Sequence, residues 1–134
     1  MRAQIDRGLP EDIEAYLKSL RERLDSPSMI LFGSMVTGTP GRWSDFDFLL
    51  IADGLPADYW ERQELLWKDK PPFVDIIGFT PAEVREKMNR GLILDALLLG
   101  KVLYGDVSEL KGMAARYVEE SGLTRSPVGY VRAS

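Results

Sequence analysis

The chain has 134 residues, enough for one ordinary domain that buries roughly two thirds of its unfolded surface. It carries 17 Lys and Arg against 21 Asp and Glu, a formal net charge of −4, and it has neither cysteine nor histidine. Disulfides, thiolate nucleophiles, Cys/His zinc sites and imidazole general bases are therefore excluded. Any chemistry must use carboxylates, hydroxyls, amines, backbone groups or a metal ion held by oxygen. The acidic balance also disfavours a nucleic-acid-binding protein, which usually presents a basic face.

No stretch of the sequence has the length and polarity of a membrane-directed segment. The most apolar stretch, residues 92–99, contains Asp95 and is far shorter than the roughly 18 residues of a membrane span. The first residues lack the apolar run of a signal peptide. Since the chain also lacks cysteine, we expect a cytoplasmic protein with no membrane partner.

Hydrophobic periodicity predicts one helix and two strands in the first third of the chain. Apolar residues recur at intervals of three and four after Pro10, which predicts an amphipathic helix over residues 11–24. Short apolar runs predict buried strands over residues 29–32 and 46–52. The loop between them, residues 33–44, is rich in Gly, Ser, Thr and Pro.

A second helix is expected over about residues 57–70, and it ends before two consecutive prolines. Tyr59, Trp60, Leu66 and Trp67 fall on one face of this helix. An aromatic stripe at helical spacing is typical of core packing, so Trp60 and Trp67 are assigned to the core.

The remaining elements follow a capping-box pattern formed by Thr80, Pro81 and Glu83. In chain order we expect a strand over 73–79, helices over 81–89 and 92–99, a short extended segment over 102–104 and a helix over 107–120. Beyond Gly122 the sequence has no period.

This order of elements predicts a small α/β or α+β domain in which helices pack on a sheet. We expect one domain over residues 1–120 and a flexible tail over residues 121–134.

Asp45 and Asp47 stand at the start of a predicted strand, where residues two apart point to the same face. Like charges about 4 Å apart repel by about 1–4 kcal/mol, and a bound divalent cation removes that penalty. Oxygen ligands without nitrogen or sulfur suit Mg²⁺ or Mn²⁺. In so acidic a chain, however, two acids at this spacing also arise by chance and then form only a solvated strand end.

Three further residues favour a functional site. Asp75 lies inside the apolar run 73–79, where a lone carboxylate is costly without a partner. Gly33 and Ser34 follow a predicted strand, where exposed amides and a hydroxyl form an anion site that the glycine lets a ligand approach closely. Carboxylates for a metal beside an amide-lined cradle are the two halves of a site for a metal-bound triphosphate.

Gly33-Ser34, ten further residues and then Asp45-Phe46-Asp47 resemble the G-S-x10-D-x-D signature of the nucleotidyltransferase (DNA polymerase β-like) superfamily. The chain most resembles the minimal nucleotidyltransferase (MNT) members of that superfamily, and the similarity covers roughly residues 29–105. The supporting positions are Phe32, Gly38-Thr39, Ser44, Asp75 and Leu103-Tyr104-Gly105.

The resemblance implies a polymerase β-like nucleotidyltransferase fold, a short mixed sheet with flanking helices on one side. It implies that Asp45, Asp47 and Asp75, the last on the neighbouring strand, are catalytic and hold two Mg²⁺ ions, or Mn²⁺. Gly33 and Ser34 would hold the phosphates of ATP or another nucleoside triphosphate. An acceptor hydroxyl would then attack the α-phosphorus, a nucleoside monophosphate would be transferred, and pyrophosphate would leave.

Small MNT proteins are similar to the antitoxin half of toxin–antitoxin pairs, in which the toxin is a helical HEPN ribonuclease. The resemblance therefore implies AMP transfer from ATP to a hydroxyl of a HEPN partner on another chain. HEPN ribonucleases use an Arg-x4–6-His motif, so a chain without histidine cannot be the toxin itself. The acidic charge disfavours a nucleic-acid acceptor, and a homo-oligomer stays open.

Three other functions also stay open. Met35 and Thr37 stand where many relatives carry basic residues, which favours a non-catalytic module that neutralises its partner by contact. A small-molecule (antibiotic) nucleotidyltransferase would need a cleft completed by a dimer, because the chain is too short for a second domain. A phosphodiesterase or nuclease would use the same carboxylates on water but would leave the Gly-Ser cradle without a purpose.

Overall fold

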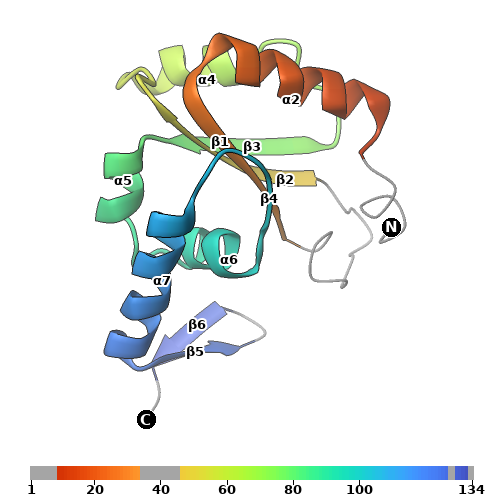
Figure 1. The fold of residues 1–134 in the computed structure, drawn as a ribbon. Coiled ribbons are helices and arrows are strands. Elements are labelled where there is room, and N and C mark those ends of the chain that lie inside the picture. The colour runs from red at the N-terminus through yellow and green to blue at the C-terminus, as the bar shows by residue number, and fades with distance from the viewer. Residues whose placement is uncertain (1–8, 34–45, 127–128, 133–134) are drawn as a thin grey trace.

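The centre of the fold is a four-stranded mixed sheet. In spatial order its strands are β3 (Val74–Phe79), β2 (Phe46–Asp53), β1 (Asp25–Phe32) and β4 (Lys101–Tyr104). β1 pairs antiparallel with β2 and with β4, whereas β2 pairs parallel with β3. The structure, a computed structural model, describes residues 9–33, 46–126 and 129–132. Helices cover both faces of the sheet (Figure 1). The α/β fold with a mixed sheet is confirmed, and the expectation of helices on one side only is wrong.

One face of the sheet is covered by α2 (Glu11–Arg23) and α4 (Tyr59–Trp67) (Figure 1). α2 matches the predicted helix 11–24 and buries one stripe of side chains at spacings of three and four: Ile13, Tyr16, Leu17 and Leu20. The hydroxyl of Tyr16 donates a hydrogen bond to the carbonyl of Leu66, so the two helices of this layer are joined.

The other face is covered by α5 (Pro81–Glu86), α6 (Gly91–Leu99) and α7 (Ser108–Ser121) (Figure 1). The predicted capping box opens α5. The Glu83 amide donates to Thr80 Oγ1 at 3.2 Å, and the Thr80 amide donates to Glu83 Oε1 at 2.8 Å. These reciprocal bonds satisfy amides that the first helical turn leaves without partners.

Alternation along β2 decides which residues face which layer. Phe48 and Leu50 belong to the core under α2 and α4, whereas Leu49 and Ile51 belong to the core under α5, α6 and α7. Because successive side chains of a strand point to opposite faces, Asp47 shares the face of Leu49. The acid is thus on the α6 side of the sheet.

The prediction that Trp60 and Trp67 lie in the core is wrong. Their side chains are 72% and 47% exposed, and Leu66 is the buried residue of α4. α4 packs on β3, the edge strand of the sheet, so a narrow stripe of the helix is covered. The rest of its apolar face is left in contact with solvent.

The C-terminal segment forms an antiparallel hairpin of β5 (Leu123–Ser126) and β6 (Gly129–Arg132) beside α7 (Figure 1). Leu123 and Tyr130 pack against the core under α7, and Arg125 Nε lies 2.9 Å from Asp95 Oδ1. The hairpin differs from the aperiodic segment expected there, while the domain boundary at residue 120 and the flexibility of residues 121–134 stay predictions. Every helix in the described part of the chain is too short or too polar to cross a membrane.

Candidate active site

Asp47 and Asp75 lie side by side at one end of the sheet. Each is the second residue of its strand, and the two are directly paired in the parallel register of β2 and β3. Neighbouring strands are about 4.8 Å apart, and paired residues present their side chains on the same face. Two carboxylates therefore project from adjacent positions, Asp47 half-buried and Asp75 exposed.

The exposure of Asp75 changes the reason for its importance. The sequence singled it out as a carboxylate inside an apolar run, where burial would be costly, but its side chain reaches solvent. Its position beside Asp47 is what brings it to the site. This is the neighbouring-strand placement that the family resemblance implies.

Gly33 lies against the carboxylate of Asp47. It follows β1 directly, in a left-handed backbone conformation with φ +85°, which glycine adopts without steric cost. A Cβ atom added to Gly33 would lie 2.5 Å from Asp47 Oδ2, closer than any real Cβ contact. The preceding residue, Phe32, pairs with Asp47 across β1 and β2. The chain after β1 therefore leaves the sheet beside the acid pair.

Two of the predicted site residues, Ser34 and Asp45, lie outside the described residues, as do Met35 and Thr37. Their roles stay predictions. Within the described residues no three acids gather into a group that could hold a metal ion. The described part of the site consists of Gly33, Asp47 and Asp75.

The residues present fit a hard divalent cation. Asp47 and Asp75 supply carboxylate oxygens from adjacent backbone positions, and oxygen-only donor sets suit Mg²⁺ and Mn²⁺. Two like charges held this close repel each other unless a cation lies between them. The absence of a side chain at Gly33 lets the main chain lie directly against the Asp47 carboxylate.

A cavity of about 480 Å³ adjoins the acid pair, a size typical of small-ligand sites. Asp47 and Asp75 form part of its wall, and Phe32, Tyr59, Gln63, Trp67 and Leu92 form other parts. Sequence reasoning missed the contribution of α4, because it assigned the α4 aromatics to packing. Tyr59, Gln63 and Trp67 are spaced four residues apart, and this spacing is the signal that could have placed them on one wall.

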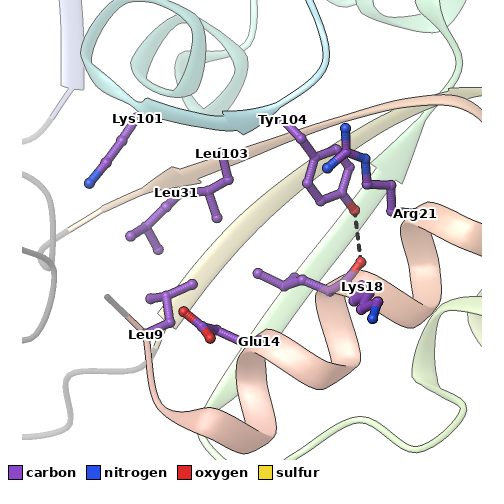
Figure 2. A pocket seen from close by; sticks show the side chains of 9 residues that line it. Leu9, Glu14, Lys18, Arg21, Leu31, Lys101, Leu103 and Tyr104 are labelled. Carbon is purple, nitrogen blue, oxygen red and sulfur yellow. Dashed lines mark hydrogen bonds between the residues drawn. The ribbon is translucent and has the colours of Figure 1, made fainter. Parts of the chain in front are cut away.

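A second cavity, of about 370 Å³, lies between α2 and β4 (Figure 2). Lys18, Arg21 and Lys101 line it together with Glu14, and the Tyr104 hydroxyl donates to the Leu17 carbonyl at 3.1 Å. None of the predicted site residues that the structure describes line this cavity. It is therefore separate from the acid pair.

Tyr104 is held firmly in that cavity. The Arg21 guanidinium lies over its ring, 5.0 Å from the centroid, and burial raises the pKa of Tyr104 to about 12. The tyrosine thus ties β4 to α2.

The sequence profile of the nucleotidyltransferase domain family matches residues 13–104, which include Gly33, Ser34 and all three predicted aspartates. The chain belongs to the nucleotidyltransferase domain family. The predicted superfamily and the predicted class of enzyme, a nucleotidyltransferase, are confirmed. No curated protein matches the sequence.

Solved structures share the fold. One is a chain of a toxin–antitoxin complex solved with AMP-PNP: it is 23% identical, with a TM-score of 0.55, over 83% of this chain and 86% of that one. Another comes from a complex of the tri-AMPylated Shewanella oneidensis HEPN toxin with its MNT antitoxin. It is 17% identical, with a TM-score of 0.51, over 91% of this chain and 90% of that one. At these identities the likeness establishes the fold of the chain.

Proposed function

We propose that this nucleotidyltransferase transfers AMP from ATP to a hydroxyl of a HEPN-type partner protein and acts as the antitoxin of a toxin–antitoxin pair. The observation that carries the proposal is the pairing of Asp47 with Asp75 beside Gly33, within a nucleotidyltransferase domain. Similar folds come from toxin–antitoxin complexes, one solved with AMP-PNP and one with an AMPylated HEPN toxin. The choice of ATP as the nucleotide and of a HEPN protein as the acceptor follows from these two complexes.

The described residues have distinct parts in this reaction. Asp47 and Asp75, with Asp45, would hold two Mg²⁺ ions, which when bound stabilise the charge on the attacking and leaving oxygens. Gly33, with Ser34, binds the phosphate end of the nucleotide through main-chain amides. In this proposal Asp75, whose carboxylate reaches solvent, accepts the proton of the incoming hydroxyl.

The reaction forms one bond and breaks another. The acceptor oxygen bonds to the α-phosphorus of ATP, the bond from that phosphorus to the bridging oxygen of pyrophosphate breaks, and pyrophosphate leaves. Positioning and electrostatics supply most of the catalysis in phosphoryl transfer, so a site without histidine suffices.

The position of the radiolabel in ATP tests the proposal. The chain and Mg²⁺ are incubated with a purified HEPN protein, the candidate acceptor, and with ATP labelled at the α- or the γ-phosphate. Label from the α-position should appear on the HEPN protein, and label from the γ-position should not. Free AMP without labelled protein would instead indicate a phosphodiesterase. Neutralisation of the toxin without ATP, with no label transferred, would indicate a module that acts by contact.

A further inference from the structure

α4 leaves three large aromatic side chains in solvent. Tyr59, Trp60 and Trp67 are 57%, 72% and 47% exposed, and the rings of Tyr59 and Trp60 meet edge to face at 5.0 Å. Aromatic side chains bury large areas favourably and are enriched at protein–protein interfaces. A nine-residue helix with three of them uncovered is thus typical of an interaction surface. We call these three residues the α4 aromatic surface.

The α4 aromatic surface continues into the cavity of the acid pair. Tyr59 and Trp67 line the same cavity as Asp47 and Asp75, whereas Trp60 is not among its lining residues. A ligand inside the cavity would contact Tyr59 and Trp67 but would leave Trp60 in water. A partner that covers all three residues must therefore be larger than the cavity and must reach the acids from outside.

Gln63 provides a second, independent observation. It lies between Tyr59 and Trp67 on the same wall, and its side-chain oxygen Oε1 is buried without a hydrogen-bond partner among the described residues. A buried acceptor without a donor costs free energy, and such groups are rare in native proteins. Because this oxygen is out of reach of solvent, a bound partner can supply its donor only after the Gln63 side chain turns outward.

The charges of α4 indicate the chemistry of that partner. Arg62 forms an ion pair with Glu83, whose Oε1 lies 2.8 Å from Arg62 Nη1. Glu61 and Glu64 are exposed, and neither is in an ion pair within the described ranges 9–33, 46–126 and 129–132. The solvent side of the helix is thus aromatic and acidic. It complements a protein face with an apolar centre and basic residues at its rim.

We propose that the α4 aromatic surface is the docking surface of the acceptor protein. The inference rests on the proposed function, because docking here would deliver an acceptor hydroxyl beside Asp75. It adds the location of the partner and the character of its contact face.

The binding test uses Trp60→Ala, because Trp60 belongs to the surface but not to the cavity wall. Affinity for the purified HEPN protein is measured by calorimetry without nucleotide, and Kd should weaken by about tenfold or more. The rise in melting temperature on adding Mg-ATP should be unchanged. Leu99→Ala on α6, where Leu99 is 45% exposed, is the matched control and should bind as the wild type does.

Charge reversal tests the predicted basic rim. Glu64→Lys should slow association with the HEPN protein several-fold at low salt, and the effect should shrink as salt is raised. Glu119→Lys makes the same change in net charge at an exposed position of α7, distant in sequence from α4. It should leave the association rate unchanged. Equal effects of the two substitutions would contradict a rim located on α4.

Two results would overturn the proposal. Wild-type affinity in both Trp60→Ala and Trp67→Ala would remove the docking surface. If Mg-ATP no longer raised the melting temperature of Trp67→Ala while the affinity for the HEPN protein was unchanged, this wall of the cavity would bind the nucleobase instead. A wild-type chain that binds the HEPN protein through Trp60 but transfers no label would overturn the proposed function and leave the docking surface standing.

Discussion

The carboxylate of Asp47 lies against the main chain of Gly33, so closely that a Cβ on Gly33 would lie 2.5 Å from Asp47 Oδ2. The contact joins the end of β1 to the start of β2, two strands that pair antiparallel. It orients the acid that also pairs with Asp75 on β3. The glycine of the Gly-Ser motif thus has a structural role toward Asp47, the proposed metal ligand, in addition to its proposed role toward phosphate.

Gly33→Ala is expected to damage both stability and activity. The alanine would have a strained backbone at φ +85°, and its Cβ would displace the Asp47 carboxylate. We expect a loss of about 2–4 kcal/mol in the free energy of unfolding, measured with urea, and loss of AMP transfer.

Gly54→Ala separates the two causes of that loss. Gly54 also has a positive φ, +72°, but an added Cβ there would have no atom within 4 Å. It should cost only about 1 kcal/mol and leave transfer intact. If the two variants lost equal stability and both kept transfer, the contact between Gly33 and Asp47 would have no functional role.

Asp47→Asn and Asp75→Asn should separate stability from function. Each removes one of two carboxylates held on paired residues, and with it the like-charge repulsion that a bound cation would relieve. Millimolar Mg²⁺ or Mn²⁺ should raise the melting temperature of the wild type and of neither variant. AMP transfer should fall by at least about 10²-fold.

Asp53→Asn is the control for those variants, because Asp53 is an exposed acid at the other end of the same strand. It should respond to metal and transfer AMP as the wild type does. If Mg²⁺ or Mn²⁺ still raised the melting temperature of Asp47→Asn and Asp75→Asn, the ion would bind elsewhere.

Local signals in the sequence were sufficient for most helices and strands. The capping box at Thr80 and the stripe of α2 depend on residues within a few positions of each other, and both are observed. The face on which Asp47 lies follows from strand alternation alone. The pairing of Asp47 with Asp75 came from the family resemblance, because the return of β3 to the side of β2 depends on contacts distant in sequence.

The mispredicted elements depended on neighbours that are distant in sequence. An apolar stripe on α4 predicts burial, but how much of it is covered depends on whether the helix lies over the centre or the edge of the sheet. It lies on β3, and Trp60 stays exposed. The strands β5 and β6 have four residues each and lack the apolar run that indicated the other short strands, so neither could be recognised. The place of Gln63 in the cavity wall depends on the same packing of α4.

Tyr104→Phe should weaken the link between α2 and β4. The hydroxyl donates to the Leu17 carbonyl, so its removal should cost about 1 kcal/mol near pH 7, measured by urea unfolding. Because burial raises the pKa of Tyr104 from 10.0 to about 12, the folded state holds this proton more tightly than the unfolded state. The stabilisation is complete below pH 10 and is lost as the pH rises from 10 to about 12.

The pH profile of Tyr104→Phe distinguishes this link from a general loss of packing. The variant should lose less stability than the wild type between pH 10 and 12. Tyr59→Phe, at an exposed tyrosine, should unfold at the wild-type urea concentration near pH 7. A Tyr104→Phe profile parallel to that of the wild type would contradict the assignment.

Arg62→Ala should destabilise the protein and loosen the proposed docking helix. The Arg62 guanidinium donates to both carboxylate oxygens of Glu83, at 2.8 and 3.2 Å, and to the carbonyls of Pro56 and Gly78. It therefore connects α4 to the end of β3 and to α5. Its removal leaves these acceptors without their donor, so we expect a loss of about 2–3 kcal/mol in urea unfolding and weaker binding of the HEPN protein.

The same contact predicts the behaviour of the protein in acid. The hydrogen bonds from Arg62 hold the pKa of Glu83 below its ordinary value of 4.5, so the stabilisation is complete above pH 4.5 and is lost as the pH falls through the lowered pKa. Glu83→Gln should flatten the decline in unfolding free energy below pH 4.5. Arg85→Ala removes an exposed ion pair with Glu109, 3.4 Å apart, and should cost less than about 0.5 kcal/mol. Equal losses in Arg62→Ala and Arg85→Ala would show that Arg62 does not anchor α4.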